Sequence, residues 1–115
     1  MLKKVFLLTV IACLFSCKSE QTIPDNIISE EEMISMLIDI RIAEGKVNAL
    51  NLPSDTAKSL FKYVERKLFE EHKLDSADYM QSYEYYMLNS EEFLKITDTV
   101  IDSLKVRLQK VTSNN

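Results

Sequence analysis

The chain has few of the residues from which turns and metal sites are built. Its 115 residues include one glycine, two prolines, one histidine and no tryptophan. No segment alternates polar and apolar residues between turn signals, so hairpins and sheets are not expected. A single histidine also excludes a multi-histidine metal site. We therefore expect an all-α protein with no metal and no cofactor.

An excess of basic residues is also missing. The chain has 18 acidic and 14 basic residues, for a formal net charge of −4. The basic residues form no cluster, whereas proteins that bind nucleic acid present a basic patch to the phosphate backbone. We expect no nucleic-acid partner and no polybasic patch for a membrane surface.

The first 20 residues have the order of a bacterial lipoprotein signal peptide. Two lysines near the start precede an apolar run at residues 5–15. This run is shorter than the roughly 20 apolar residues that span a bilayer. It ends in Leu-Phe-Ser-Cys at residues 14–17, a lipobox in which a small residue precedes the cysteine that takes the diacylglycerol. We predict cleavage after Ser16 and lipidation of Cys17. The alternatives are an ordinary secretory signal with a chance cysteine and an uncleaved anchor.

Lipidation would determine both the location of the protein and its cysteine chemistry. Cleavage removes Cys13 and acylation uses Cys17, so disulfides and thiolate sites are excluded. Loss of two lysines with residues 1–16 changes the formal charge from −4 to −6. Two or three acyl chains give stable anchoring. We expect a lipid-anchored protein of the bacterial cell envelope, on the periplasmic side or in the outer membrane.

The remaining sequence predicts one small domain. Residues 17–27 are the lipidated cysteine and a flexible polar tether, residues 28–111 a compact bundle of about four helices, and residues 112–115 a polar tail. The first helix opens at Ser29 with a capping box that includes Glu32. Two adjacent apolar stripes predict that neighbouring helices cover it on two sides. A close helix crossing would explain Gly45 in its interior, where glycine costs about 1 kcal/mol relative to alanine.

The other three helices are predicted from capping residues and apolar periodicity. Position 54 or 55 caps the second helix, and Asp75 caps the third. A left-handed turn at Asn89 then leads to the fourth helix, which Ser90 caps and which runs to about residue 110.

Four segments of these helices resemble a known family: LIDIRIAE at 37–44, LDSADY at 74–79 with Ser82, Tyr85 and Tyr86 after it, NSEEF at 89–93, and VIDSL at 100–104. Over roughly residues 27–106 the chain resembles the bacterial lipoproteins catalogued as domain of unknown function 4296. That family tends to have glycine where Lys73 stands and proline where Ser90 stands. Lysine is strained in a left-handed turn, so we expect the turn after the second helix to differ. The resemblance implies fold and location, and no activity.

The residues considered for chemistry cluster in the first and third helices. Asp39 and Glu44 lie about 140° apart around the helix, so they form no carboxylate pair, and we expect no intrahelical salt bridge from Arg41. The structural interpretation is that these acids bond tyrosine hydroxyls or helix ends on facing helices. The functional hypothesis is a shallow polar pocket lined by Asp39, Arg41, Glu44, Tyr85 and Tyr86. His72 is expected to be an imidazole near a helix C-terminus rather than an acid–base or metal group.

Two functions remain open at this point. The favoured one is a non-enzymatic interaction module that binds a protein partner or assembles with its own copies. The alternative is an envelope glycan- or lipid-binding protein or hydrolase that uses Asp39, Glu44 and Tyr86. The two hypotheses differ in whether these three side chains line a cavity that reaches solvent or are packed shut.

Overall fold

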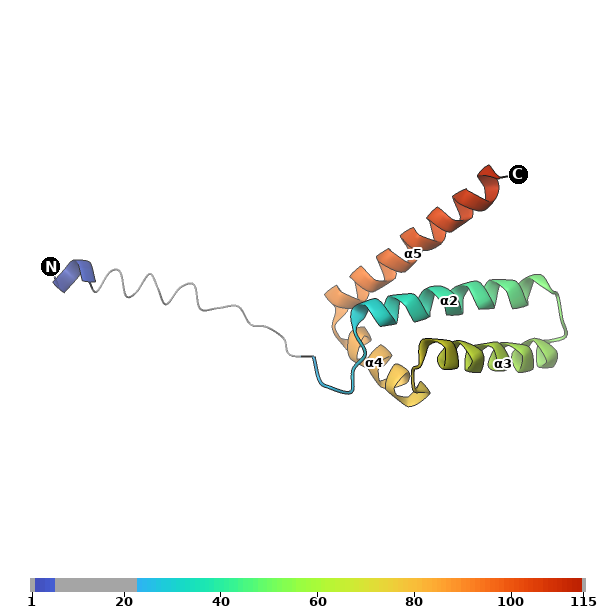
Figure 1. Ribbon diagram of the computed structural model, residues 1–115, viewed down its shortest axis with the longest axis horizontal. Coiled ribbons are helices and arrows are strands. Elements are labelled where there is room, and N and C mark those ends of the chain that lie inside the picture. The colour runs from blue at the N-terminus through green and yellow to red at the C-terminus, as the bar shows by residue number, and fades with distance from the viewer. Residues whose placement is uncertain (1, 6–22, 115) are drawn as a thin grey trace.

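A computed structural model describes residues 2–5 and 23–114, so the predicted cleavage site and Cys17 lie outside the described residues. Over residues 23–114 the helices follow in the order α2 (Glu30–Ala49), α3 (Ser54–His72), α4 (Ser76–Leu88) and α5 (Ser90–Ser113) (Figure 1). No strand occurs in the described part of the chain, and the prediction of an all-α helical bundle is confirmed.

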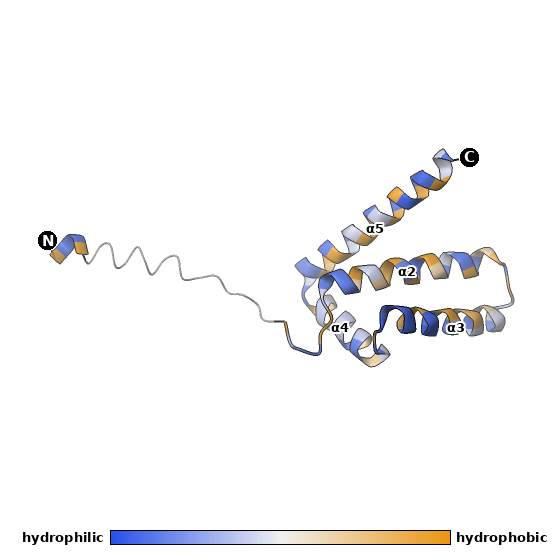
Figure 2. Cartoon of the chain, viewed as in Figure 1, coloured by the Kyte–Doolittle hydropathy of each residue, from blue (hydrophilic) through white to orange (hydrophobic). Residues whose placement is uncertain are grey.

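Helix α2 is the centre of the bundle. It packs antiparallel to α3 in a helical hairpin and also contacts α4 and α5. Figure 2 shows apolar residues along most of α2, whereas α3 is largely hydrophilic with one apolar side. The buried side chains of α2 are Met33, Met36, Leu37, Ile38, Ile40, Ala43 and Val47. The prediction that neighbouring helices cover α2 on two sides is therefore confirmed.

The start of α2 follows the predicted capping chemistry. The Glu32 amide donates to the Ser29 hydroxyl at 3.2 Å, and the Ser29 amide donates to the Glu32 carboxylate at 3.1 Å. These two bonds satisfy backbone donors that the helix itself leaves unpaired. Asp75 likewise caps α4, since its carboxylate accepts from the amides of Ala77 and Asp78.

Two other helix starts differ from prediction. Helix α3 begins at Ser54, and the residue before it, Pro53, makes no side-chain capping bond. Asn89 has φ of −103° rather than a left-handed value, and Ser90 is the first residue of α5 rather than its cap. Helix α5 also continues to Ser113, so the first two residues of the expected polar tail are helical.

The turn after α3 contains a residue in the left-handed conformation that glycine adopts most readily. Lys73 has φ 53° and ψ 40°, which is left-handed. Its amide donates to the Glu70 carbonyl, and the Leu74 amide donates to the Phe69 carbonyl at 3.0 Å. Leu74 and Phe69 both pack against the core. This is a Schellman motif, and its bonds and apolar contact offset the strain of a non-glycine residue. The expectation of a different turn was wrong.

The explanation offered for Gly45 was also wrong. A Cβ atom built on this residue meets no atom of residues 2–5 and 23–114 within 4 Å, so none of the helices described there crosses closely at this point. The residue is exposed on α2 and has no positive φ. Packing therefore does not require glycine at this position.

Candidate functional site

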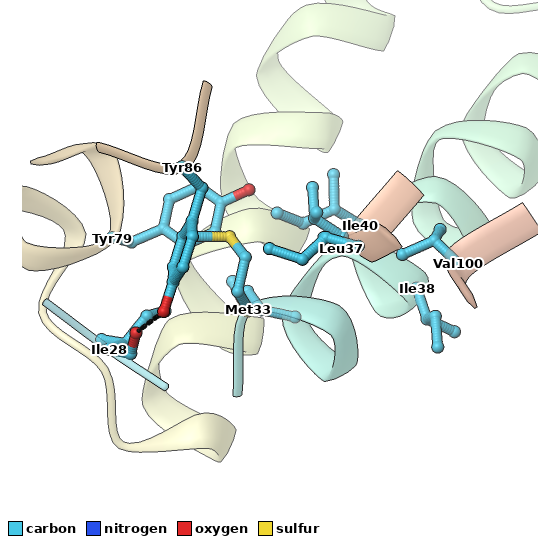
Figure 3. Close-up of a cluster of buried hydrophobic side chains, with 10 residues drawn as sticks. Ile28, Met33, Leu37, Ile38, Ile40, Tyr79, Tyr86 and Val100 are labelled. Carbon is cyan, nitrogen blue, oxygen red and sulfur yellow. Dashed lines mark hydrogen bonds between the residues drawn. The ribbon is translucent and has the colours of Figure 1, made fainter. Parts of the chain in front are cut away.

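Tyr86 is packed shut rather than open to solvent. Its side chain is fully buried beside Met33, and its hydroxyl donates to the carbonyl of Ile28 at 2.7 Å (Figure 3). Burial raises the pKa of Tyr86 to about 12, with nearby Glu30 and Glu92 adding to the rise. A neutral phenol that is committed to a backbone carbonyl is a structural group.

The other backbone group of Ile28 is bonded to the same helix. Its amide donates to the Ser82 hydroxyl at 2.9 Å, and that hydroxyl donates to the Asp78 carbonyl at 2.6 Å. Ser82 and Tyr86 lie one turn apart on α4, and both have 0% exposure. We call Ile28, Ser82 and Tyr86 the Ile28 clamp. It fixes the chain that enters α2 against α4.

Asp39 makes a contact between helices, and its partner, His72, was not identified from the sequence. Its Oδ2 lies 2.7 Å from Nε2 of His72, and this bond joins the middle of α2 to the last residue of α3. The His72 side chain is 17% exposed. A partner for Asp39 at the end of a facing helix agrees with the structural interpretation. The imidazole lies at the C-terminal end of α3, as expected, and it also bonds that end to α2.

Arg41 and Glu44 form the salt bridge that was not expected. Arg41 Nη1 lies 2.9 Å from Glu44 Oε2, because Glu44 follows Arg41 by three residues and the two therefore share a helix face. The hydrogen bond that the Arg41 guanidinium donates to Glu44 raises the pKa of Arg41 above its ordinary value. Both side chains are well exposed, so the pair contributes only about 0.3–0.5 kcal/mol.

The tyrosines of α4 are mainly packing residues. Tyr79 is buried between Phe69 of α3 and Tyr83, with ring centroids 5.4 and 6.4 Å away. Tyr83 continues this row to Phe93 of α5 at 5.8 Å. Burial raises the pKa of Tyr79 to about 12, and the neighbouring Tyr83 adds to the rise. Tyr85 is half-buried and packs its ring edge-on against Tyr86 at 5.4 Å.

The five residues of the hypothetical polar pocket therefore do not converge. Arg41 and Glu44 line a hollow of about 220 Å³ together with Tyr79 and Tyr83. Asp39, Tyr85 and Tyr86 do not line it.

A larger hollow shares Leu37, Arg41 and Tyr83 with this one. It has a volume of about 390 Å³, and α2, α4 and α5 contribute its mostly apolar lining of Leu37, Arg41, Tyr83, Phe93, Thr97, Val100, Ile101 and Leu104. We call it the α5 groove. Sequence reasoning missed it, although the apolar residues of α5 recur more often than one buried face requires.

The exposed surface of α5 continues from this groove. Ile101 at its edge is 43% exposed, and Leu108 and Val111 further along are 65% and 63% exposed. The methionines of α2, Met33 and Met36, are buried, whereas Met80 and Met87 on α4 are exposed.

The described residues contain neither a metal site nor a membrane-spanning helix. No group of three histidine, cysteine, aspartate or glutamate side chains within residues 2–5 and 23–114 could hold a metal ion. None of the helices in those ranges has the length and apolar character needed to cross a bilayer.

Comparison with known proteins establishes the family. The family described as "Domain of unknown function (DUF4296)" matches residues 24–110, and the chain belongs to it. This confirms the resemblance drawn from the four segments. The match covers all of α2, α3 and α4 and most of α5. No curated protein and no solved structure matches the chain.

Proposed function

We propose that this protein is a non-enzymatic helical interaction module, held at a membrane of the bacterial cell envelope by lipid on Cys17. The observation that carries the proposal is the α5 groove, an open apolar hollow that continues into exposed apolar residues of α5. Contiguous exposed apolar surface of this kind marks sites of association.

The positions of the candidate catalytic groups favour a module over an enzyme. Tyr86 is bonded to a backbone carbonyl, Asp39 to His72, and Glu44 to Arg41. A hydrolase would need an acid, a base and a substrate site within a few ångströms of one another. Because these groups are engaged in separate places, we do not propose the glycan- or lipid-directed alternative.

The anchoring part of the proposal is tested at the two cysteines. The Cys17→Ala protein should lose palmitate incorporation and leave the membrane fraction, because no other group would hold it there. The Cys13→Ala protein is the matched control and should behave as the parent does. A Cys17→Ala protein that still labels with palmitate and fractionates with membranes would contradict the anchor.

The interaction part is tested by photo-crosslinking in cells. A benzophenone amino acid placed at Ile101, at the edge of the α5 groove, should give a discrete crosslinked protein band. The same probe at Tyr63, an exposed residue of α3, is the control and should not. Absence of any product from Ile101 would count against the module.

A further inference from the structure

We infer that the α5 groove is occupied by a second copy of this chain, with the two α5 helices paired antiparallel. This inference rests on the proposed function and names its partner. The paired helices would form a two-fold interface in which each copy contributes the same surface.

The spacing of apolar residues along α5 carries the first part of the argument. Intervals of three and four alternate along one face of the helix, at Leu94, Thr97, Ile101, Leu104, Leu108 and Val111, and all of these except Thr97 are apolar. This is the a/d pattern of a coiled-coil seam. The helix packs on α2 through a different face, which contains the buried Ile96 and Val100. Leu104 of the seam also packs against the core, whereas Leu94, Ile101, Leu108 and Val111 are at least 43% exposed.

The two halves of the seam have different surroundings. Thr97, Ile101 and Leu104 line the α5 groove beside α2 and α4. Beyond residue 104 every described residue of α5 is exposed, and the helix extends past the other helices (Figure 1). One half therefore offers a groove, and the other half offers a projecting apolar helix that could fill such a groove.

An antiparallel pairing brings these unlike halves together. It places Thr97 opposite Leu108 of the partner subunit and Leu94 opposite Val111 of the partner subunit, with Ile101 and Leu104 at the centre. Each of the six seam positions then faces a seam position of the other copy. Each projecting half lies in the other copy's groove. A parallel pairing would leave both grooves without a projecting half.

Charge complementarity selects the same orientation. Asp98 and Lys105 flank the seam on its outer side and are exposed. In the antiparallel pair Asp98 lies beside Lys105 of the partner subunit, and the two-fold axis repeats this contact. In a parallel pair the residues opposite Asp98 and Lys105 are Phe93 and Val100 of the partner subunit, so no charge pair forms. Flanking charges of this kind set partner choice and orientation in coiled coils.

Disulfide trapping in the full-length, membrane-anchored chain tests the pairing. Two differently tagged copies are expressed together, one with Thr97→Cys and the other with Leu108→Cys, and membranes are oxidised. We expect a disulfide-linked mixed dimer that separates into monomers when a reducing agent is added. Either variant expressed alone should give no more dimer than the unsubstituted chain, whose Cys13 and Cys17 set the background. In the antiparallel pair like positions lie too far apart for a disulfide.

Charge reversal provides the matched test of orientation. Asp98→Lys should lower the yield of mixed dimer roughly fivefold, since it turns two attractions into repulsions. Adding Lys105→Asp to the same chain should restore the yield. Both residues are exposed, and circular dichroism should show unchanged helix content in each variant.

Four results would overturn the inference. A disulfide from Leu108→Cys alone, and none from the mixed pair, would indicate a parallel pair. Failure of the double reversal to restore the yield would exclude the Asp98–Lys105 contact. A chain with no dimer, but with a different protein crosslinked at Ile101, would overturn the inference and leave the proposed function standing. If neither disulfide trapping nor photo-crosslinking at Ile101 gives a product, both the inference and the proposed function are contradicted.

Discussion

The Ile28 clamp is a closed region of this small bundle, and the α5 groove is an open one. At the clamp, Ser82 and Tyr86 have 0% exposure and their hydroxyls are fully engaged. At the groove, apolar side chains of α5 remain open to solvent. The clamp is closed because the segment before α2 covers α4 there. The groove is open because no segment of the described chain covers it. An apolar helix face therefore becomes core or surface according to what lies across from it.

The largest expected difference between the two regions is in the cost of truncating a side chain. Tyr86→Ala should lower the free energy of unfolding by about 3–5 kcal/mol, because it removes a buried ring and its bond to Ile28. Leu108→Ala should change it by no more than about 0.5 kcal/mol in dilute protein, where any dimer is dissociated. Urea unfolding followed by circular dichroism measures both. Equal costs would contradict the contrast between clamp and groove.

The second largest expected effect is a loss of stability at alkaline pH, which comes from the buried tyrosines of the closed region. Tyr79 and Tyr86 have a pKa of about 12 in the fold, against 10.0 for an ordinary tyrosine. The unfolded chain loses these protons first, so stability is unaffected below pH 10 and falls as the pH rises to 12. Each tyrosine should lower the free energy of unfolding by about 1.4 kcal/mol per pH unit in that window.

The ionisation itself can be measured by absorbance at 295 nm. Two of the five tyrosines should ionise only near pH 12 or together with unfolding. In Tyr86→Phe only one late tyrosine should remain. Ionisation of all five tyrosines near pH 10 in the folded protein would contradict the burial of this region.

The serine of the clamp should have an intermediate effect. Ser82→Ala leaves the buried amide of Ile28 without an acceptor, which costs about 1–3 kcal/mol. Ser103→Ala is the matched control on α5. Its hydroxyl bonds only to the Thr99 carbonyl within the helix, and its loss should cost less than about 0.5 kcal/mol. Thermal unfolding of the two variants side by side measures the difference, and similar melting temperatures would count against the clamp.

The smallest expected effect is a gain, outside both regions. Gly45→Ala should raise the free energy of unfolding by up to about 1 kcal/mol, since the helix gains propensity and the new methyl group meets no atom. The same urea unfolding measurement applies. A loss of stability would show that a partner approaches α2 closely at this position.

The helix caps and the helical periodicity could be predicted from the sequence because both depend on residues close together in the chain. The Ser29 capping box, the Asp75 cap and the two-sided burial of α2 all depend on residues a few positions apart. The Arg41–Glu44 pair was readable in the same way from its spacing of three, although it was not predicted.

Contacts between distant residues were not readable. Asp39 and His72 meet because the α2–α3 hairpin brings an interior residue of one helix to the end of the other. Ser82 stood on the apolar face of its helix, which hinted at burial, but its partner at Ile28 could not be identified from spacing. Lys73 could adopt its left-handed turn because Leu74 and Phe69 pack behind it.

By itself, the sequence determined that the chain is helical, where α2 and α4 begin, and which residues form apolar stripes, because caps and periodicity act within one or two turns. Only the tertiary structure decided which stripe became the closed core around Tyr86 and which became the open seam of α5. That outcome depends on how the helices cross and on which segment covers each face, and side-chain spacing along a single helix contains neither.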